Sequence, residues 1–211
     1  MTHPVRIDTD GEEAVDIHDF NRAKKADKTW KPLGVTGNGV NWHWESAPSG
    51  ADEYITGTAV VGQGWGGYKG EVWLGRQIEV YDSDGDDPED LVDIYFDISA
   101  SGYVFAGGSG SAEAEIEGII EDVDSGTTRS VSLLNFSAAR AGANSTNGLS
   151  QYKGKINNFE LDVNDTYNVW VKLRVEAHVQ GVSMSFADFG NEDGDSGEYV
   201  QINKITIDKG H

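Results

Sequence analysis

An acidic loop between residues 82 and 90 has the residue types of a calcium site. Its sequence is Asp82-Ser83-Asp84-Gly85-Asp86-Asp87-Pro88-Glu89-Asp90. Ca²⁺ prefers hard oxygen ligands, so the candidate ligands of calcium or another divalent cation are Asp82, Asp84, Asp86 and Asp87. The spacing departs from the EF-hand loop, because Gly85 comes too early and the twelfth position is Asp93 rather than Glu. A solvated turn is the alternative, and the similar acidic loop at 191–198 has the same two interpretations.

A second group of carboxylates, in the run Glu113-Ala114-Glu115-Ile116-Glu117, has strand spacing. On a strand all three glutamates project from one face, with neighbours about 7 Å apart. The run resembles the acidic strand of laminarinase-like jelly-roll glycosidases, in which two carboxylates flank the scissile bond. It departs from that pattern because its middle acid is Glu rather than Asp. The solvated face of a strand predicts the same residues.

Two tryptophans, Trp42 and Trp44, are spaced two residues apart and share one face if they lie on a strand. Such a pair forms a possible glycan platform, because indole rings stack on sugars. Packing in the interior of a sandwich is the alternative use.

Residues 1–33 differ from the rest of the chain and are predicted to form an N-terminal arm. Two apolar runs flank Asp10-Gly11, which indicates a hairpin, and a short helix is expected over residues 19–27. The one dense basic cluster of this acidic chain is formed by Lys24, Lys25, Lys28 and Lys31. It predicts an arm that docks on a negative partner, and an ordinary solvated helix end is the alternative. If the arm serves assembly, the residues that attach it are Val5, Ile7, Val15, Ile17, Phe20, Lys24, Lys25, Lys28 and Lys31.

The elements that position these groups are strands. From residue 34 onward, short apolar runs recur every ten to fifteen residues, separated by Gly, Asp, Asn and Ser. The clearest run spans residues 169–179, where odd positions are apolar and even positions are polar. Residues 34–211 therefore predict an all-β fold, an antiparallel β-sandwich or jelly roll of about ten strands.

The charge of the chain limits its partners. The formal net charge is −20, and the acid is spread along the whole chain. We interpret this as adaptation to high salt, because at molar ionic strength the Debye length falls to about 3 Å and self-repulsion is screened. Nucleic acid is excluded as a partner, since phosphate contacts need Lys and Arg.

Other classes of site find no matching residues. There is no cysteine for a disulfide or a thiolate site. The start at Met1 has no apolar signal region, and no stretch is long enough for a membrane span, so the chain is expected to be made in the cytoplasm.

The start at Met1, the arm from Val5 to Lys31 and the two closing runs, residues 185–190 and 199–208, are similar in style to structural proteins of tailed viruses of halophilic archaea. The resemblance implies a non-enzymatic virion part, such as a capsid decoration, turret or tail-fibre component. It further implies a homo-oligomer that contacts other virion proteins and possesses no cofactor. A carbohydrate-binding β-sandwich module is the alternative, a jelly-roll glycosidase is the third hypothesis, and a virion part could also contact a host surface glycan.

Overall fold

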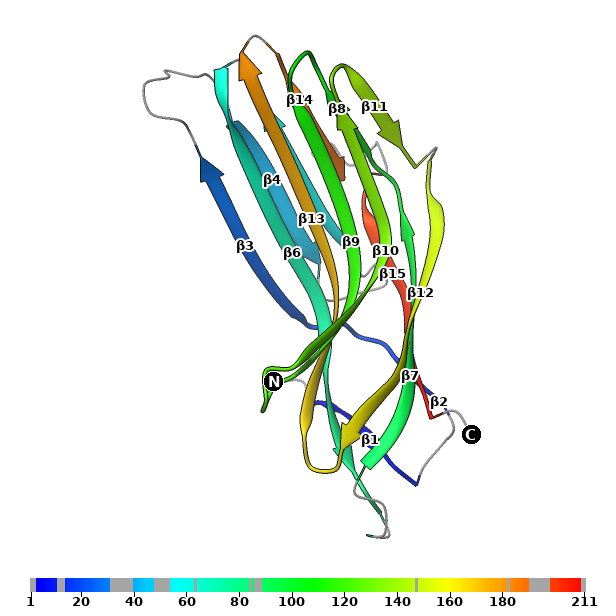
Figure 1. Cartoon of the computed structure of the whole chain (residues 1–211). Coiled ribbons are helices and arrows are strands. Elements are labelled where there is room, and N and C mark those ends of the chain that lie inside the picture. The colour runs from blue at the N-terminus through cyan, green and yellow to red at the C-terminus, as the bar shows by residue number, and fades with distance from the viewer. Residues whose placement is uncertain are drawn as a thin grey trace.

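The computed structural model describes residues 3–10, 14–30, 40–47, 54–62, 64–83, 85, 89–146, 148–181, 183–189 and 198–209. For residues 25–30, 40–47, 64, 65, 89 and 180 the description is of the backbone alone. These residues form fifteen strands and no helix (Figure 1). The predicted all-β sandwich is confirmed, although its strands exceed the ten expected. No helix in the described ranges is long and apolar enough to cross a membrane.

The first sheet has six of the described strands. In spatial order β6 is followed by β13, β9 and β10, while β3 and β1 share the other side of β6. Only the pairing of β1 with β6 is parallel. The bounds are β1 (Val5–Asp8), β3 (Arg22–Trp30), β6 (Gly64–Tyr81), β9 (Ser111–Asp122), β10 (Thr128–Ala139) and β13 (Thr166–Gly181).

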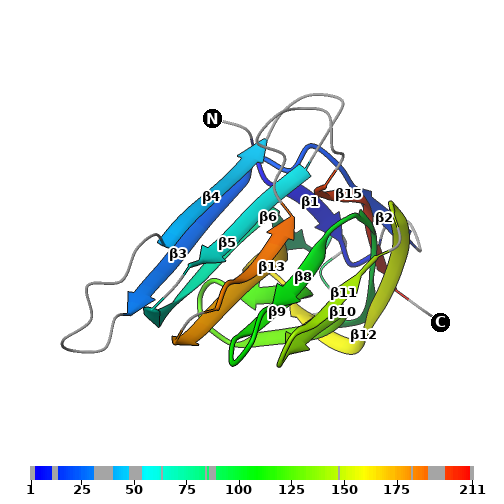
Figure 2. The same cartoon turned by 90° about the horizontal axis from the view of Figure 1, so that it is seen from above.

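The second sheet has nine of the described strands. Its order is β11-β8-β14-β5-β15-β7-β12, with β4 paired to β5 and β2 paired to β15. The bounds are β2 (Ala14–Ile17), β4 (Val40–Ala47), β5 (Tyr54–Val61), β7 (Glu89–Ala100), β8 (Tyr103–Ala106), β11 (Gly142–Ser145), β12 (Ser150–Asp162), β14 (Ser185–Phe189) and β15 (Val200–Asp208). The two sheets pack on each other, with β13 against β5 and β14, and β10 against β12 (Figure 2).

The core follows from alternation along the strands. Every second residue of β9 is buried, and on β13 the odd-numbered residues from Val169 to Val179 are at most 3% exposed. Each strand therefore presents an apolar face to the other sheet and a polar face outward. The polar outer faces carry the candidate sites.

The N-terminal segment differs from its prediction. Residues 5–8 and 14–17 do not form a hairpin with each other, because β1 pairs with β6 in the first sheet and β2 with β15 in the second. The side chains of Ile7, Ile17 and Phe20 are at most 1% exposed. Val5 and Val15 are half-buried, and Val5 packs against the core. Burial of these apolar groups in the sandwich accounts for the difference.

The predicted helix over residues 19–27 is also wrong. Residues 22–30 form β3, which pairs antiparallel with residues 67–75 of β6. The segment Ala23-Lys24-Lys25-Ala26 suits a helix by propensity, but pairing with a long strand overrides so weak a local preference. Arg22 fixes the start of β3, because its guanidinium donates to Asn168 Oδ1 at 2.7 Å and to Gln77 Oε1 at 2.8 Å. The domain boundary predicted at residue 34 lies outside the described residues.

Candidate binding site

Three neighbouring rows of the second sheet each consist of two strands placed end to end, and the junctions lie at the same level. We call this level the sheet break. The strands that meet at this level are β7 and β8, β12 and β11, and β15 and β14. Below the break Ala100 pairs with Ser150 and Val200, and above it Tyr103 pairs with Ser145 and Asp188. In Figure 1 the strands β8, β11 and β14 accordingly lie above β7, β12 and β15.

Backbone hydrogen bonds join the connecting residues of neighbouring rows at the sheet break. The amide of Ser101 donates to the carbonyl of Tyr199 at 2.9 Å, and the amide of Thr146 donates to the carbonyl of Gly102 at 3.1 Å. A Cβ at Gly102 would lie 2.6 Å from the ring of Phe189, so glycine is required there for the ring to pack. The break is therefore a built feature of the sheet.

An open hollow of about 500 Å³ lies at the sheet break. Its polar groups come from β8, from β11 and from the residues that connect the strands at the break, and they include hydroxyl, amide and carboxylate side chains. The residues that line it are Ser101, Gly102, Tyr103, Ala143, Asn144, Ser145, Thr146, Gly148 and Glu198. A hollow of this volume has the size of a small-molecule binding site.

Half-buried aromatic rings flank the hollow on the outer face of the second sheet. Tyr103 meets Phe186 edge to face at a centroid distance of 5.1 Å, and Phe105 stacks on Phe186 at 5.1 Å. Tyr199, next to Glu198 in the chain, lies 6.3 Å from Tyr54. All five rings are partly exposed, whereas the residues between them on β5, β8 and β14 are buried. The site thus offers apolar ring surface to a ligand.

Two carboxylates lie among these rings. Burial, with the charge of Asp188 beside it, raises the pKa of Glu198. Burial and both carboxylates raise the pKa of Tyr103. The hydroxyl of Thr58 donates to Asp188 Oδ1 at 2.9 Å, which fixes that carboxylate. The hollow therefore combines aromatic surface with negative charge.

The predicted acidic strand lies elsewhere, on the outer face of the first sheet. Glu113, Glu115 and Glu117 share one face of β9, as expected. Arg174 of β13 bridges Glu113 at 2.6 Å and Glu115 at 3.1 Å, and Lys172 pairs with Glu117. We call these five residues the ion-pair face. Glycoside hydrolysis needs a carboxyl pair free to reach the substrate, so this arrangement does not support the glycosidase hypothesis.

Lys24 joins this outer face. Its Nζ lies 3.3 Å from Glu121 Oε2, 4.8 Å from the ring centroid of Trp170 and 5.3 Å from that of Trp73. The indole of Trp170 donates to Glu121 at 2.8 Å and lies across Gly75, where a Cβ would come within 2.5 Å of the ring. The lysine thus has partners within the chain, and the assembly role predicted for it stays a prediction.

Several predicted site residues lie outside what the structure describes. Lys25 and Lys28 are on β3 and Trp42 and Trp44 on β4, where only the backbone is described, and Lys31 is outside the described residues. The register pairs Trp42 with Ala59 and Trp44 with Gly57. The assembly role of the lysines and the glycan platform of the tryptophans stay predictions.

The acidic loop at 82–90 is described only in part. The carboxylate of Asp82 accepts a hydrogen bond from the amide of Gly85 at 2.8 Å, as in a turn. Asp84, Asp86 and Asp87 lie outside the described residues, as does the 191–197 segment. Calcium binding by either loop stays a prediction.

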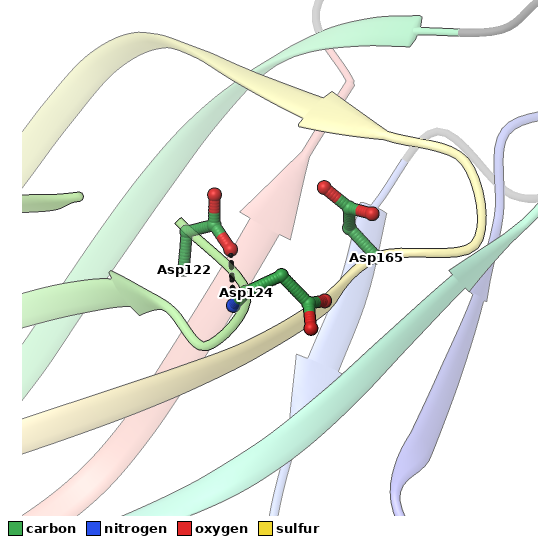
Figure 3. A group of neighbouring side chains, drawn as sticks. All are labelled: Asp122, Asp124 and Asp165. Carbon is green, nitrogen blue, oxygen red and sulfur yellow. Dashed lines mark hydrogen bonds between the residues drawn. The ribbon is translucent and has the colours of Figure 1, made fainter. Parts of the chain in front are cut away.

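The structure brings together another acidic group that the sequence did not single out. One carboxylate oxygen each from Asp122, Asp124 and Asp165 lies within 4.8 Å of the others (Figure 3). Asp122 is buried and accepts hydrogen bonds from the amides of Asp124 and Ser125 at 2.8 and 3.1 Å. Burial and the neighbouring aspartates raise the pKa of Asp165. Three such oxygens suit a hard cation, but their separation in the sequence gives no local signal.

Comparisons with known proteins return carbohydrate-binding modules among solved structures. One is TmCBM61 in complex with β-1,4-galactotriose, at 11% identity and a TM-score of 0.24, covering 88% of this chain and 91% of the other. A second is a xylan-binding domain of family 22, at 13% identity and a TM-score of 0.23, covering 85% and 92%.

A third is the family 22 xylan-binding domain of Paenibacillus barcinonensis Xyn10C, at 13% identity and a TM-score of 0.21, covering 90% and 99%. No family model and no curated protein matches the chain. Because identities and TM-scores are this low, the function has to be argued from the residues of the chain itself.

Proposed function

We propose that this protein binds carbohydrate at the sheet break of its second sheet. The observation that carries the proposal is the open hollow, where half-buried rings border hydroxyl, amide and carboxylate groups. Sugars present apolar C–H faces and many hydroxyls, so they need ring surface and hydrogen-bonding groups together.

The two surfaces differ in what they leave available to a ligand. On the ion-pair face Arg174 and Lys172 already engage the glutamates. At the hollow, Tyr103 and Phe186 expose ring surface, and Glu198 lines an open volume. A ligand at the sheet break therefore gains contacts without first separating ion pairs, whose loss costs binding energy.

Replacement of Tyr103 by Ala tests the proposal. Affinity electrophoresis and calorimetry against a panel of soluble polysaccharides should first identify a ligand of the wild type. Loss of one stacking ring is worth about 1 kcal/mol or more, so Tyr103→Ala should weaken binding about tenfold.

The matched control is Tyr95→Ala, because Tyr95 is another exposed tyrosine of the second sheet, 38% exposed on β7. It should bind like the wild type, and both variants should retain the wild-type circular dichroism spectrum. Equal loss of affinity in the two variants, or no binding to any glycan, would remove the proposal.

A further inference from the structure

We propose that the glycan bound at the sheet break carries free amino groups, so that the site selects a cationic sugar chain. The inference rests on the proposed carbohydrate-binding function. The geometry that supports it is a half-buried carboxylate, Glu198, in an open hollow beside aromatic rings, with Asp188 close by.

The charges around the hollow are of one sign. Glu198 is the charged residue among those that line it. Within the described part of the chain, no lysine or arginine and no hydrogen-bond donor pairs with this carboxylate. Asp188 interacts with both Glu198 and Tyr103 through its charge. A ligand group that satisfies Glu198 must therefore be a donor, and a cation also offsets the repulsion from Asp188.

The aromatic rings favour the same kind of group. The faces of Tyr and Phe rings attract an ammonium group through their quadrupole, more strongly when the contact is desolvated. Tyr103 lines the hollow and contacts Phe186, both rings are half-buried, and partial burial strengthens such contacts. Ring surface and carboxylate together are complementary to an aminosugar, which offers an apolar C–H face and an ammonium on one ring.

The same charges disfavour two other classes of glycan. A uronic acid or sulfated chain would meet Glu198, Asp188 and a net protein charge of −20. A neutral or N-acetylated chain can donate hydroxyl hydrogen bonds to Glu198 but leaves its charge uncompensated. Charge-assisted hydrogen bonds are roughly twice as strong as neutral ones, so the ammonium form should bind about tenfold tighter.

Three oligosaccharides of equal length distinguish these classes. The full-length protein is titrated with a β-1,4-glucosamine hexamer, its fully N-acetylated counterpart and a galacturonic acid hexamer. The buffer is dilute and at about pH 6, where free carboxyl groups are ionised and free amino groups are protonated. The expected order is glucosamine about tenfold tighter than the acetylated chain, with the uronic acid chain weakest.

Two variants separate a local effect of Glu198 from the overall charge of the protein. Glu198→Gln should remove the preference for glucosamine while the acetylated chain still binds. Glu79→Gln makes the same charge change on β6, away from the hollow, and should keep the preference.

The outcomes distinguish the two proposals. Equal binding of the glucosamine and acetylated chains, or a preference that persists in Glu198→Gln, overturns the choice of an aminosugar and leaves carbohydrate binding intact. If neither these oligomers nor the polysaccharide panel binds, the proposed function fails and this inference fails with it.

Discussion

The outer faces of the two sheets use the same acidic composition in opposite ways. On the first sheet β9 and β13 run side by side for twelve residue pairs, so glutamates of one strand meet cations of the other. On the second sheet the strands stop at the sheet break, and Glu198 stands at the interruption with Asp188 nearby. Continuous pairing lets charges compensate each other, whereas at the interruption Glu198 lines an open hollow that a ligand can enter.

The comparison also shows how a strand pattern and a site are related. Regular alternation places the three glutamates of β9 on one face, and the neighbouring strand then satisfies them. The hollow exists because three rows of the sheet lose their regularity together, which opens space that side chains do not fill. In a β-sandwich, departures from regular pairing are therefore informative about binding.

The largest expected effect is on stability and concerns the N-terminal strands β1 and β2. The comparison assumes that both faces belong to one sandwich, to which these strands contribute core residues. Ile17 of β2 is fully buried in the second sheet's core and Ile7 of β1 is 1% exposed. Either residue replaced by Ala should lower the free energy of unfolding by about 2–5 kcal/mol, because a cavity forms in the core.

Urea unfolding followed by tryptophan fluorescence measures this effect. Leu91→Ala, at a side chain 57% exposed on β7, serves as the control and should change stability by less than about 0.5 kcal/mol. Wild-type stability of both Ile7→Ala and Ile17→Ala would mean that β1 and β2 add nothing to the core, as expected if residues 1–33 form a separate arm.

A smaller effect tests whether the ion-pair face is held by its cations. Arg174→Met leaves Glu113 and Glu115 without their shared partner, and like charges on neighbouring positions then repel. Because these side chains are partly exposed, the expected loss is only about 1 kcal/mol, and it should shrink in molar KCl.

Arg6→Met is the matched control, since the Arg6 side chain is 60% exposed and its Nε lies 4.0 Å from Glu79. It should leave the denaturation midpoint unchanged. If Arg174→Met matches it at low salt, the ion pairs of the first sheet contribute nothing measurable and the contrast between the faces loses its energetic basis.

The sequence predicted those parts of the fold that depend on one strand at a time. Alternation on β9 and β13 is local, so the sandwich and the shared face of Glu113, Glu115 and Glu117 were predicted and are confirmed. Arg174 and Lys172 were identified as outward residues of their strand, but nothing in the sequence says that β13 lies next to β9. The pairing register of a strand and the identity of the strand beside it depend on tertiary contacts, which the local pattern does not contain.

The sheet break was missed for the same reason. It needs Gly102, Thr146 and Tyr199, which are more than forty residues apart in the chain but meet through backbone hydrogen bonds. The helix expected over residues 19–27 failed because the partner strand β6 decided the conformation. A virion role, self-association and adaptation to salt depend on surroundings that one chain does not contain, and they stay predictions.

The smallest expected effect is on the pH dependence of stability. It compares Glu198, whose pKa is raised, with Asp93, whose pKa is lowered. Burial and Asp188 raise the pKa of Glu198 above its ordinary value of 4.5. A hydrogen bond from Lys155, with one from the amide of Asn158, lowers the pKa of Asp93 below its ordinary 3.8. Linkage then gives the two groups opposite effects on stability.

The direction of each effect on stability depends on whether the folded or the unfolded state binds the proton more tightly. The raised pKa of Glu198 stabilises the fold fully below about pH 4.5, and this stabilisation is lost as the pH rises through the folded value. The lowered pKa of Asp93 stabilises the fold above about pH 3.8, and this is lost as the pH falls through the folded value. At neutral pH the first carboxylate therefore destabilises the fold and the second stabilises it.

Melting temperatures of Glu198→Gln and Asp93→Asn, measured from about pH 3 to pH 7, should diverge from the wild type in opposite directions. Glu198→Gln should become the more stable protein as the pH rises, by less than about 1 kcal/mol because the site is open to solvent. Asp93→Asn should become the less stable one, since the hydrogen bonds from Lys155 and Asn158 no longer meet a charged acceptor. Loss of stability in Glu198→Gln at neutral pH would show that a partner already compensates this carboxylate, and the sheet break would then resemble the ion-pair face.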